Sequence, residues 1–372
     1  MTRRFIAVLI KEVREIWRDP YTLSMAIALP LIFLFLFAYA TNLDVGDLPL
    51  AVYDQDQTRA SRDYVTQLTT GDQFYLHSQV WSEAELKRLM DRDAVQVGLI
   101  IPPGFGETLQ AGRPAMVQTW LDGSFPPTAE VATGYVTAFN QVYSARQVAA
   151  LTGQAFRPAI VVEPRVWYNP DLKSVNFVVP GLYAVILLAF PPMLSALTVV
   201  REKEQGSIQQ IFVSPIRPAE FILGKLIPYG VIAFVEMLTI FVVGIGWFRV
   251  PFRGDLALLL VAALIYVLGA VGFGLLISTL TSSQLAASLA ALVLTMMPAL
   301  IFSGFFYPIF NMPSVVQRVT HLFPARYFVV IARGIGLKGV DLETLWPELR
   351  WMLAYTLVVF ALASLRFKKK VG

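Results

Sequence analysis

Two short segments of the sequence resemble nucleotide-binding motifs, and both lack parts that the chemistry requires. Leu223–Leu226 reads LGKL and contains the Gly-Lys pair of a phosphate-binding loop, but it lacks the upstream glycine spacing and the hydroxyl residue. Gly334–Gly339 fits the G-x-G-x-x-G pattern, but no strand–helix–strand unit surrounds it. We therefore interpret these glycines as loop residues and predict no nucleotide site on this chain.

Metal and covalent chemistry are equally unsupported. The 372 residues include no cysteine, which excludes disulfides, thiol catalysis and cysteine-ligated zinc. The only histidines, His77 and His321, are far apart and have no companions at metal-ligand spacing. The sequence contains no nucleophile elbow and no convincing pair of acid and base. We predict that the chain is not an enzyme and carries no cofactor of its own.

One acidic residue remains a candidate for function. Glu236 lies in the middle of the apolar segment Phe221–Trp247. A charge at the centre of a transmembrane helix costs about 2.5–3.5 kcal/mol on insertion scales, so an acid there is a functional hypothesis by default. We assign Glu236 to the translocation pathway, where it would attract cations or titrate during transport. The alternative is a protonated or hydrogen-bonded side chain that joins helices.

The segments around this residue are those of a membrane protein. Hydrophobic residues make up 56% of the chain and charged residues 15%, whereas soluble domains have about 45–50% and about 25%. The mean hydropathy is +0.60. A transmembrane helix needs about 20 mainly apolar residues. Six segments are candidates: Tyr21–Ala40, Phe177–Val200, Phe221–Trp247, Leu256–Leu280, Leu285–Phe306 and Trp351–Leu365. The sixth is short unless it begins near Leu345 or continues to Phe367.

The placement of Lys and Arg predicts how these helices are oriented. Basic residues cluster before the first span, between the second and third, and after the sixth. Loops rich in Lys and Arg stay in the cytoplasm, so we expect a multi-pass protein with both termini cytoplasmic. The net charge of +4 then reflects topology, and we expect the lipid bilayer, not nucleic acid, as a partner.

Residues 307–350 are an exception to this charge pattern. Several basic residues fall on the outer side of the predicted topology, among them Arg318, Arg326, Arg333 and Lys338. Three prolines divide the segment into short pieces, and Leu322–Leu337 is apolar enough to enter the bilayer. We predict a pair of short re-entrant or interfacial helices folded against the membrane surface.

Residues 41–176, between the first two spans, have the composition of a soluble domain. Strand-like runs alternate with helix-like runs, which favours one small α/β domain. The predicted strands are Leu48–Tyr53, Phe74–Val80, Val95–Ile101, Met116–Leu121 and Ile160–Tyr168. The predicted helices are Thr58–Leu68, Ser82–Met90 and a long one within Pro127–Leu151. The overall prediction is a mainly α membrane protein with six transmembrane helices and an α/β extracytoplasmic domain between helices 1 and 2.

The remaining divisions follow from these spans. Residues 1–20 form a cytoplasmic interface helix, residues 21–40 the first transmembrane helix, and residues 177–372 the other five. In the interface helix, apolar residues recur at helical spacing opposite basic ones: Phe5, Leu9, Val13, Ile16 and Trp17 against Arg4, Lys11, Arg14 and Arg18. The helix is either a plain amphipathic anchor or an anchor that also contacts a cytoplasmic partner.

Residues 199–215 read VVREKEQGSIQQIFVSP and interrupt two apolar spans with charges. Ser207 is a suitable N-cap, Ile208, Ile211 and Phe212 supply an apolar face, and Pro215 ends the run. We predict a short helix within residues 201–220 that lies parallel to the membrane. Such a helix either rests on the lipid surface or inserts into a groove on a partner.

In these features the chain resembles the ABC-2 type permeases, the membrane subunits of bacterial ATP-binding-cassette exporters. The resemblance covers essentially the whole chain. Its motifs are Lys11-Glu12 with Arg18-Asp19-Pro20, then Arg201–Ser207 with Ser214-Pro215, and the series Ser303-Gly304-Phe305, Tyr307-Pro308, Met312-Pro313 and Phe323-Pro324. The external domain, with Asp54-Gln55-Asp56, Ile101–Phe105 and Asp122-Gly123-Ser124, looks like that of the long-ectodomain drug-export subgroup.

The resemblance implies a permease for multidrug efflux in a bacterial inner membrane. Two permeases, copies or paralogues, would pair as a dimer, and a separate ATPase subunit would bind ATP and Mg. Movements of the ATPase would be transmitted to the spans through the segment after span two and through the interface helix. The implied coupling residues are Arg201, Glu202, Glu204, Gly206, Ser207, Ile208, Ile211, Phe212 and Pro215, with Lys11, Glu12, Arg14 and Arg18 of the interface helix. The external domain would dock a periplasmic adaptor or gate the exit.

Two other functions remain open, and so does the substrate of an exporter. A receptor would bind a ligand with its external domain and use the spans only as an anchor. An ion-driven carrier would use Glu236, although no inverted repeat is apparent. The substrate of an exporter is also open, because apolar spans rich in Phe and Met suit amphipathic small molecules but do not exclude lipids, glycans or cations.

Overall fold

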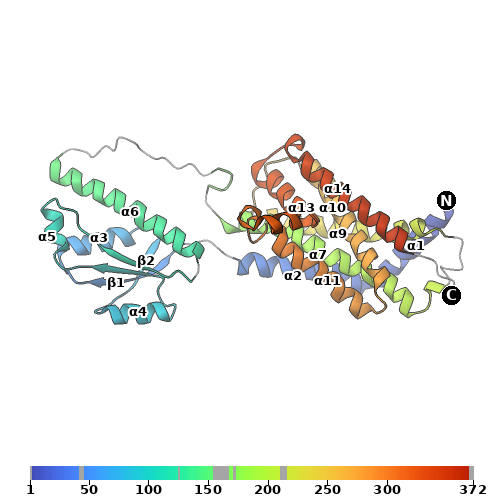
Figure 1. The fold of residues 1–372 in the computed structure, drawn as a ribbon, viewed down its shortest axis with the longest axis horizontal. Coiled ribbons are helices and arrows are strands. Elements are labelled where there is room, and N and C mark those ends of the chain that lie inside the picture. Colours follow the sequence, from blue (N-terminus) through green and yellow to red (C-terminus); the bar gives the residue numbers. More distant parts are fainter. Residues whose placement is uncertain are drawn as a thin grey trace. The chain divides into compact units, whose positions relative to one another are not determined.

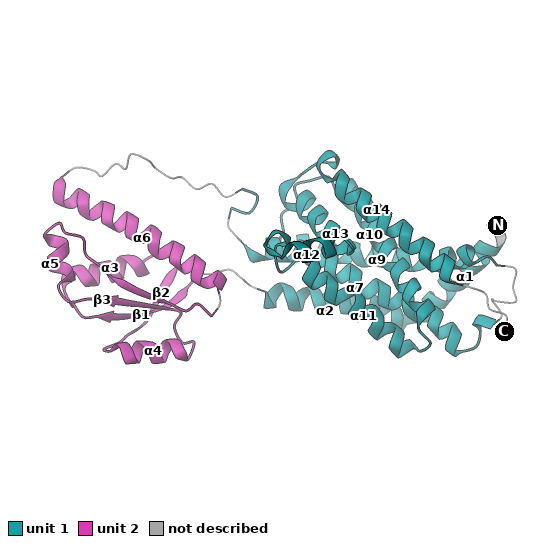
Figure 2. Cartoon of the chain, in the orientation of Figure 1, with its two compact units in different colours: residues 1–42, 166–372 teal, residues 43–165 magenta. Residues whose placement is uncertain are grey.

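The computed structural model describes residues 2–41, 46–124, 126–153, 167–170, 173–209 and 216–367. The chain forms two compact units, shown in Figure 2: unit 1 contains residues 1–42 and 166–372, and unit 2 contains residues 43–165. Each unit has its own hydrophobic core. We describe the smaller unit first.

Unit 2 is built on a four-stranded sheet with the strand order β2-β1-β3-β4. Strand β1 (Leu48–Asp54) pairs in parallel with β2 (Phe74–Gln79) and with β3 (Val97–Ile101), and β4 (Gln118–Leu121) pairs antiparallel with β3. Strand β3 reads VGLII, and all five residues are buried. A continuous apolar run of this kind is typical of a strand covered on both faces.

Helices cover both faces of this sheet, as Figure 1 shows. On one face, α3 (Arg59–Thr69) and α6 (Pro126–Thr152) pack against alternate residues of β1, including Leu50 and Val52. On the other face, α4 (Glu83–Asp91) packs through Leu86 against Ala51 and Ile100. A short helix that the sequence did not suggest, α5 (Phe105–Gln110), follows β3. Most of the predicted strand Ile160–Tyr168 lies outside the described residues, and Tyr168 itself is not in a strand.

Within its described residues, unit 1 contains six helices that are long and apolar enough to cross a membrane, as predicted. They are α2 (Pro20–Ala40), α7 (Ser174–Glu204), α9 (Pro218–Gly246), α10 (Leu256–Leu280), α11 (Gln284–Phe302) and α14 (Leu342–Arg366). A seventh helix, α1 (Thr2–Arg18), precedes them. The chain is therefore mainly helical, and its six apolar helices are those of a multi-pass membrane protein.

Helix α7 is the centre of unit 1. In its most apolar stretch 89% of the residues are buried, against 22% in α2, α11 and α14. It packs against α2, α9, α10, α11 and α13 (Pro324–Arg333). Small residues allow helices of unit 1 to pack closely. On α10, a Cβ added to Gly274 would overlap Pro192 of α7, and one added to Gly269 would lie 2.6 Å from Thr356 Oγ1 of α14. The glycines of α10 thus serve contacts within the subunit.

The segment predicted as short outer helices has that general form but different limits. It contains η1 (Ile309–Asn311), α12 (Ser314–Thr320), α13 and the π-helical turn η2 (Gly334–Lys338). Residues 342–350, which we had included in this segment, form the first turns of α14. We ended this segment at Arg350 because the sixth apolar run begins at Trp351. Leu345, Leu349 and Met352 are buried at helical spacing, so the helix begins earlier, as the alternative start near Leu345 allowed.

Two basic residues of this segment, Arg326 and Arg333, have local partners. Arg333 donates to the carbonyl oxygens of Gly304 (3.1 Å) and Phe305 (3.3 Å), and its guanidinium lies 3.6 Å from the centroid of the Phe177 ring. Arg326 donates to Gln317 O (3.0 Å) and contacts Thr320. These arginines close the ends of short helices, which explains how they fit a segment expected on the outer side.

Candidate functional site

The helix α1 packs against α9 through a small residue. A Cβ added to Gly224 would lie 2.6 Å from Val8 Cγ1, so only glycine allows the two helices to approach this closely. Val8 and Glu12, one turn apart on α1, are both buried in this contact. The Gly-Lys pair that resembled part of a phosphate-binding loop therefore has a packing role, and it places Lys225 opposite Glu12.

Five charged residues meet at this contact, and we call them the charge cluster: Lys11, Glu12, Glu15, Glu202 and Lys225. Lys225 Nζ lies 2.6 Å from Glu12 Oε1 and 3.3 Å from Glu202 Oε1. Lys11 Nζ contacts the same Glu202 oxygen and lies 3.3 Å from Glu12 Oε1 and 3.2 Å from Glu15 Oε1. The charge cluster joins α1, α7 and α9.

Burial makes this cluster energetically important. The side chains of Lys225 and Glu12 are 0% and 1% exposed, and that of Glu202 is 6% exposed. Surface ion pairs contribute about 0–1 kcal/mol, whereas removing one partner of a buried pair costs about 3–5 kcal/mol because an uncompensated charge is left behind. The Phe221 ring, 5.2 Å from the Lys225 ammonium, adds a cation–π contact.

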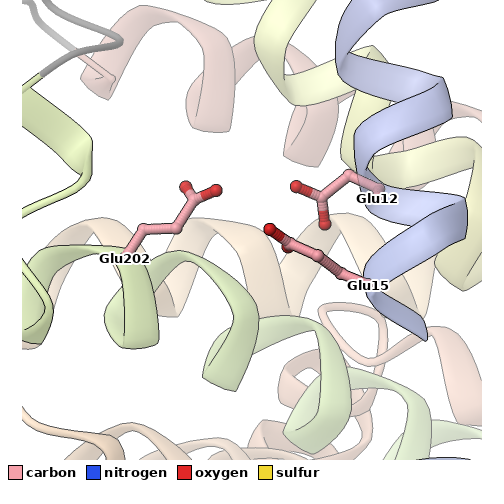
Figure 3. Close-up of side chains that lie close together, drawn as sticks. All are labelled: Glu12, Glu15 and Glu202. Carbon is pink, nitrogen blue, oxygen red and sulfur yellow. The ribbon is translucent and has the colours of Figure 1, made fainter. Parts of the chain in front are cut away.

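The carboxylates of Glu12, Glu15 and Glu202 lie close enough together to hold a cation. Their oxygens lie within 4.8 Å of one another, and Figure 3 shows Glu12 and Glu15 projecting from α1 towards Glu202 of α7. Two lysine ammonium groups already lie among them, so the positive charge comes from the chain itself. Burial lowers the pKa of Lys11, but the hydrogen bond to Glu202 and the charges of Glu202, Glu12 and Glu15 outweigh this effect and raise the pKa above its ordinary value.

The four residues 201–204, at the end of α7, each contact a different part of the bundle. Arg201 Nη1 lies 3.0 Å from Asp19 Oδ2, between α1 and α2, and Glu202 belongs to the charge cluster. Lys203 Nζ donates to the carbonyl of Thr281 (2.9 Å) and to that of Ser278 at the end of α10. Glu204 accepts from the backbone N–H of Gln284 (2.8 Å), the first residue of α11. We expected Glu202 and Glu204 to pair with basic residues of the interface helix or of the ATPase. Glu202 pairs with Lys11 of that helix, and Glu204 bonds to Gln284 of α11.

These contacts correct the limits of the predicted helix within residues 201–220. Residues 201–204 continue α7, and residues 218–220 begin α9. Gly206 has a φ of +73°, which ends α7 in a conformation that favours glycine. Ser207 donates to the Glu202 carbonyl (3.3 Å), and Ile208 is buried in the core of unit 1. Residues Ile211, Phe212 and Pro215 lie outside the described residues.

Asp19 fixes the corner between α1 and α2. Its carboxylate accepts from Thr22 Oγ1 (2.7 Å) and from the Thr22 backbone N–H (3.1 Å), which caps α2. These hydrogen bonds, and after them the Arg201 guanidinium, lower the pKa of Asp19 although burial opposes the shift. The corner therefore remains charged and bonded to α7 at neutral pH.

The apolar face that we predicted on α1 is only partly covered by the bundle. Val13 and Trp17, which we assigned to this apolar face, are 47% and 81% exposed. Together with Ile6 and Ile10 they form an exposed apolar stripe at helical spacing. Arg14 and Arg18 are exposed on a third, polar face. The sequence predicted one boundary between apolar and basic residues, whereas the apolar arc is shared between the bundle and this stripe.

Glu236 lies inside the bundle. It is 1% exposed, and neither carboxyl oxygen has a hydrogen-bond partner in the described part of the chain. Its neighbours on the same face of α9, Ala233, Met237 and Ile240, are also buried. In this conformation Glu236 is therefore closed off from water.

Two members of the charge cluster, Glu15 and Lys225, were not among the predicted site residues. We counted Lys225 only as a basic residue after the second span and as part of a failed phosphate-binding motif. Like Glu236, however, it lies within the predicted span Phe221–Trp247, where a charged residue is costly and needs a partner. The position of a charged residue inside an apolar span was visible in the sequence. Its partners Glu12 and Glu202 were not, because they lie far from Lys225 along the chain.

The sequence matches known proteins over nearly its full length. Residues 20–365 match the family model described as ABC-2 family transporter protein. The probable multidrug ABC transporter permease YbhS of Escherichia coli (strain K12) is 33% identical over 370 residues, covering 99% of this chain and 98% of that protein. The permease YbhR of the same organism, also named a probable multidrug ABC transporter permease, is 32% identical over 371 residues and covers 100% of both chains.

A more distant relative points in the same direction. The inner membrane transport permease YhhJ of Escherichia coli (strain K12) is 25% identical over 366 residues, which cover 98% of this chain and 96% of that protein. The family match, the full-length similarity and the six apolar helices are consistent with one another. The chain is therefore a member of the ABC-2 family of transporter proteins, a multi-pass permease of the inner membrane.

Proposed function

We propose that this permease exports amphipathic small molecules, driven by a separate ATPase subunit that binds ATP and Mg, and that it works as a dimer with a second copy or a paralogue. The observation that supports this most is the charge cluster, because it connects α1 with the end of α7 where residues 201–208 lie. Both regions belong to the ends that the positive-inside rule assigns to the cytoplasm. Unit 2 is then extracytoplasmic.

The three faces of α1 suggest how a displacement would be passed on. One face is joined to α7 and α9 by Glu12 and Val8, the apolar stripe of Ile6, Ile10, Val13 and Trp17 contacts lipid, and Arg14 and Arg18 face the cytoplasm. An ATPase that contacts the cytoplasmic face would move α1. Because the buried ion pairs are costly to break, the end of α7 would follow.

From the end of α7 the movement would reach other helices. Lys203 is bonded to the end of α10 and Glu204 to the start of α11. A shift of residues 201–204 would therefore be transmitted to both helices at once. This arrangement allows a local push to change how the spans pack, which is what alternating access requires.

A cleft at the same end of the bundle suits an amphipathic substrate. It encloses about 290 Å³ between the end of α1, the start of α2, α7 and Tyr229 of α9. Leu194 and Leu197 form an apolar wall, and Arg18 and Arg201 provide polar rims. The names of YbhS and YbhR describe probable multidrug permeases, which also favours substrates that combine apolar and polar parts.

The coupling proposal can be tested by co-purification. The chain, expressed with its proposed ATPase subunit, should retain that subunit, and replacing Arg14 and Arg18 together by Ala should weaken the association. A matched control replaces Arg62 and Arg88 of unit 2, which are exposed but far from α1 in the sequence. Retention of the ATPase by the α1 variant at the level of the control would contradict the assignment of this face.

The role of Glu236 in the pathway is tested by a conservative change. Glu236→Gln keeps the size of the side chain and removes its charge, so we expect efflux of the cationic dye ethidium from proteoliposomes to fall while the amount of assembled complex stays the same. Thr239→Val on the same helix, which alters a half-buried residue whose hydroxyl donates to the Val235 carbonyl, is the control. Unchanged ethidium efflux in the Glu236 variant would show that this carboxyl group only joins helices.

A further inference from the structure

Unit 2 contains a pocket to which neither the family nor the export proposal assigns a role. It encloses about 380 Å³ between α3, the start of β2 and α6, and we call it the α3–α6 pocket. Ligand-binding pockets for small molecules measure about 300–1,000 Å³. The pocket is therefore large enough for a molecule of one or two rings.

Aromatic side chains form most of its inner wall. Tyr135, Phe139 and Tyr143 follow one another at helical spacing on α6, and Phe74 of β2 lies opposite Tyr135 with ring centroids 6.1 Å apart. Phe139 and Tyr143 stack with centroids 5.7 Å apart, and both pack edge-on against Tyr64 of α3. These mutual contacts hold the rings in fixed orientations, which prepares a rigid surface for a flat aromatic ligand.

A second row on α6 forms the mouth of the pocket. Ala138, Val142 and Arg146 follow one another at intervals of four residues, and all three are exposed. Val142 leaves 52% of its surface uncovered, so the apolar lining continues to the opening. The small side chain of Ala138 leaves space beside the aromatic row, and a larger residue at this position would fill it.

Arg146 is the only charged residue among the described residues that line the pocket. Its Nη1 donates to Gln67 Oε1 of α3 (3.3 Å), which holds the guanidinium across the opening. No carboxylate of the described residues forms an ion pair with it. A guanidinium that is oriented but not neutralised is suited to bind a carboxylate or sulfonate.

From these observations we propose that the α3–α6 pocket binds a small, flat aromatic molecule that carries an anionic group. The rings contact Phe139 and Tyr135, and the anionic group pairs with Arg146. All residues involved belong to unit 2, so the proposal does not depend on how the bundle is coupled to an ATPase. It adds a ligand-binding role to a unit that the family match describes only as part of a transporter.

The test uses the full-length chain in detergent and a photoaffinity probe of the proposed class. The probe 4-benzoylbenzoate combines two aromatic rings with a carboxylate, and its neutral amide, 4-benzoylbenzamide, has the same shape without the charge. We expect saturable labelling by the acid, mapped by mass spectrometry to peptides of α6 or α3 and suppressed by excess biphenyl-4-carboxylate. Labelling that does not saturate, or that spreads over the whole chain, would refute the proposal.

Two substitutions separate the aromatic wall from the charge. Arg146→Met should reduce labelling by the acid about tenfold, as expected for a lost charge-assisted hydrogen bond, and should change labelling by the amide much less. Ala138→Phe should reduce labelling by both probes because it fills the pocket. Arg113→Met, which removes an exposed arginine outside the pocket, should leave both unchanged.

Folding must be checked in the same preparations. Ala138 and Arg146 are exposed, so neither change should lower the melting temperature of the chain by more than the Arg113→Met control does. If both variants are folded and are labelled by the acid as strongly as the unsubstituted chain, the proposal is wrong.

Discussion

Lys225 shows how much a single buried charge decides in this protein. Its ammonium group has no exposed surface and lies between two carboxylates from other helices. A lysine in that position neutralises charges that could not otherwise be buried. The Lys225 side chain thus holds α1 and the end of α7 together, although neither element is its neighbour in the sequence.

A double-mutant cycle measures this contribution. Lys225→Met should destabilise the chain by about 3–5 kcal/mol, because Glu12 and Glu202 lose their buried partner. The double variant that carries both Lys225→Glu and Glu12→Lys should be more stable than either single variant, because opposite charges again face each other. Thermal unfolding in detergent would give the values. Lys87→Met, which breaks an exposed pair with Asp91, should change stability by no more than about 1 kcal/mol.

The pH dependence of the melting temperature should reveal the contribution of charged Lys11 to stability. Its pKa is raised in the folded state, so its contribution is complete below the ordinary lysine value of about 10.4 and is lost as the pH rises through the folded value. The melting temperature of the unsubstituted chain should therefore decrease above about pH 10.4. In Lys11→Arg the charge persists at these pH values, and the decrease should be smaller. Identical curves for the two proteins would contradict this assignment.

At the level of elements, the spans were predictable and the contacts between them were not. Apolar runs of about 20 residues fix the existence of membrane helices, and all six predicted spans correspond to candidate membrane helices. The predicted helix boundaries were wrong at residues 342–350 and 201–204, where charged residues lie at the end of an apolar helix. There the local pattern suggested a loop or a new helix, whereas distant partners such as Asp19, Thr281 and Gln284 allow the existing helix to continue.

The same reason explains the incomplete prediction of the site. Lys11, Glu12 and Glu202 were proposed on two separate segments, and the structure brings them together through Lys225. Spacing within one segment gives the face of a helix but not the helix that will cover it. Val13 and Trp17 illustrate this limit, because their spacing predicts an apolar face and only the position of α9 shows which part of that face is covered and which part stays exposed.

The contact between α1 and α9 can be tested through its glycine. Gly224→Ala should cost about 1–3 kcal/mol because the added methyl group overlaps Val8. Gly246→Ala at the end of the same helix meets no atom within 4 Å and should be neutral or slightly stabilising. Thermal unfolding of both variants distinguishes a steric effect from a general effect of alanine in α9. Equal melting temperatures for the two would exclude the close approach.

At the level of the whole molecule, the absence of cysteine makes the proposed topology directly measurable. A single cysteine at Gln110 of unit 2 should react with a membrane-impermeant maleimide in cells whose outer membrane alone is opened. A cysteine at Arg14 of α1 should react only after the inner membrane is also opened, because α1 is expected in the cytoplasm. Labelling of both positions from the same side would refute the orientation.

The position of unit 2 in the sequence has a consequence for how this protein can change over evolutionary time. Helices α2 and α7 pack against each other, although residues 43–165 are inserted between them. An insertion between two contacting helices leaves the packing of unit 1 independent of its contents, and unit 2 has a separate core. Unit 2 can therefore be lengthened, exchanged or deleted in evolution while the transport helices keep their packing. A change of unit 2 as a whole would then change the ligand that it binds.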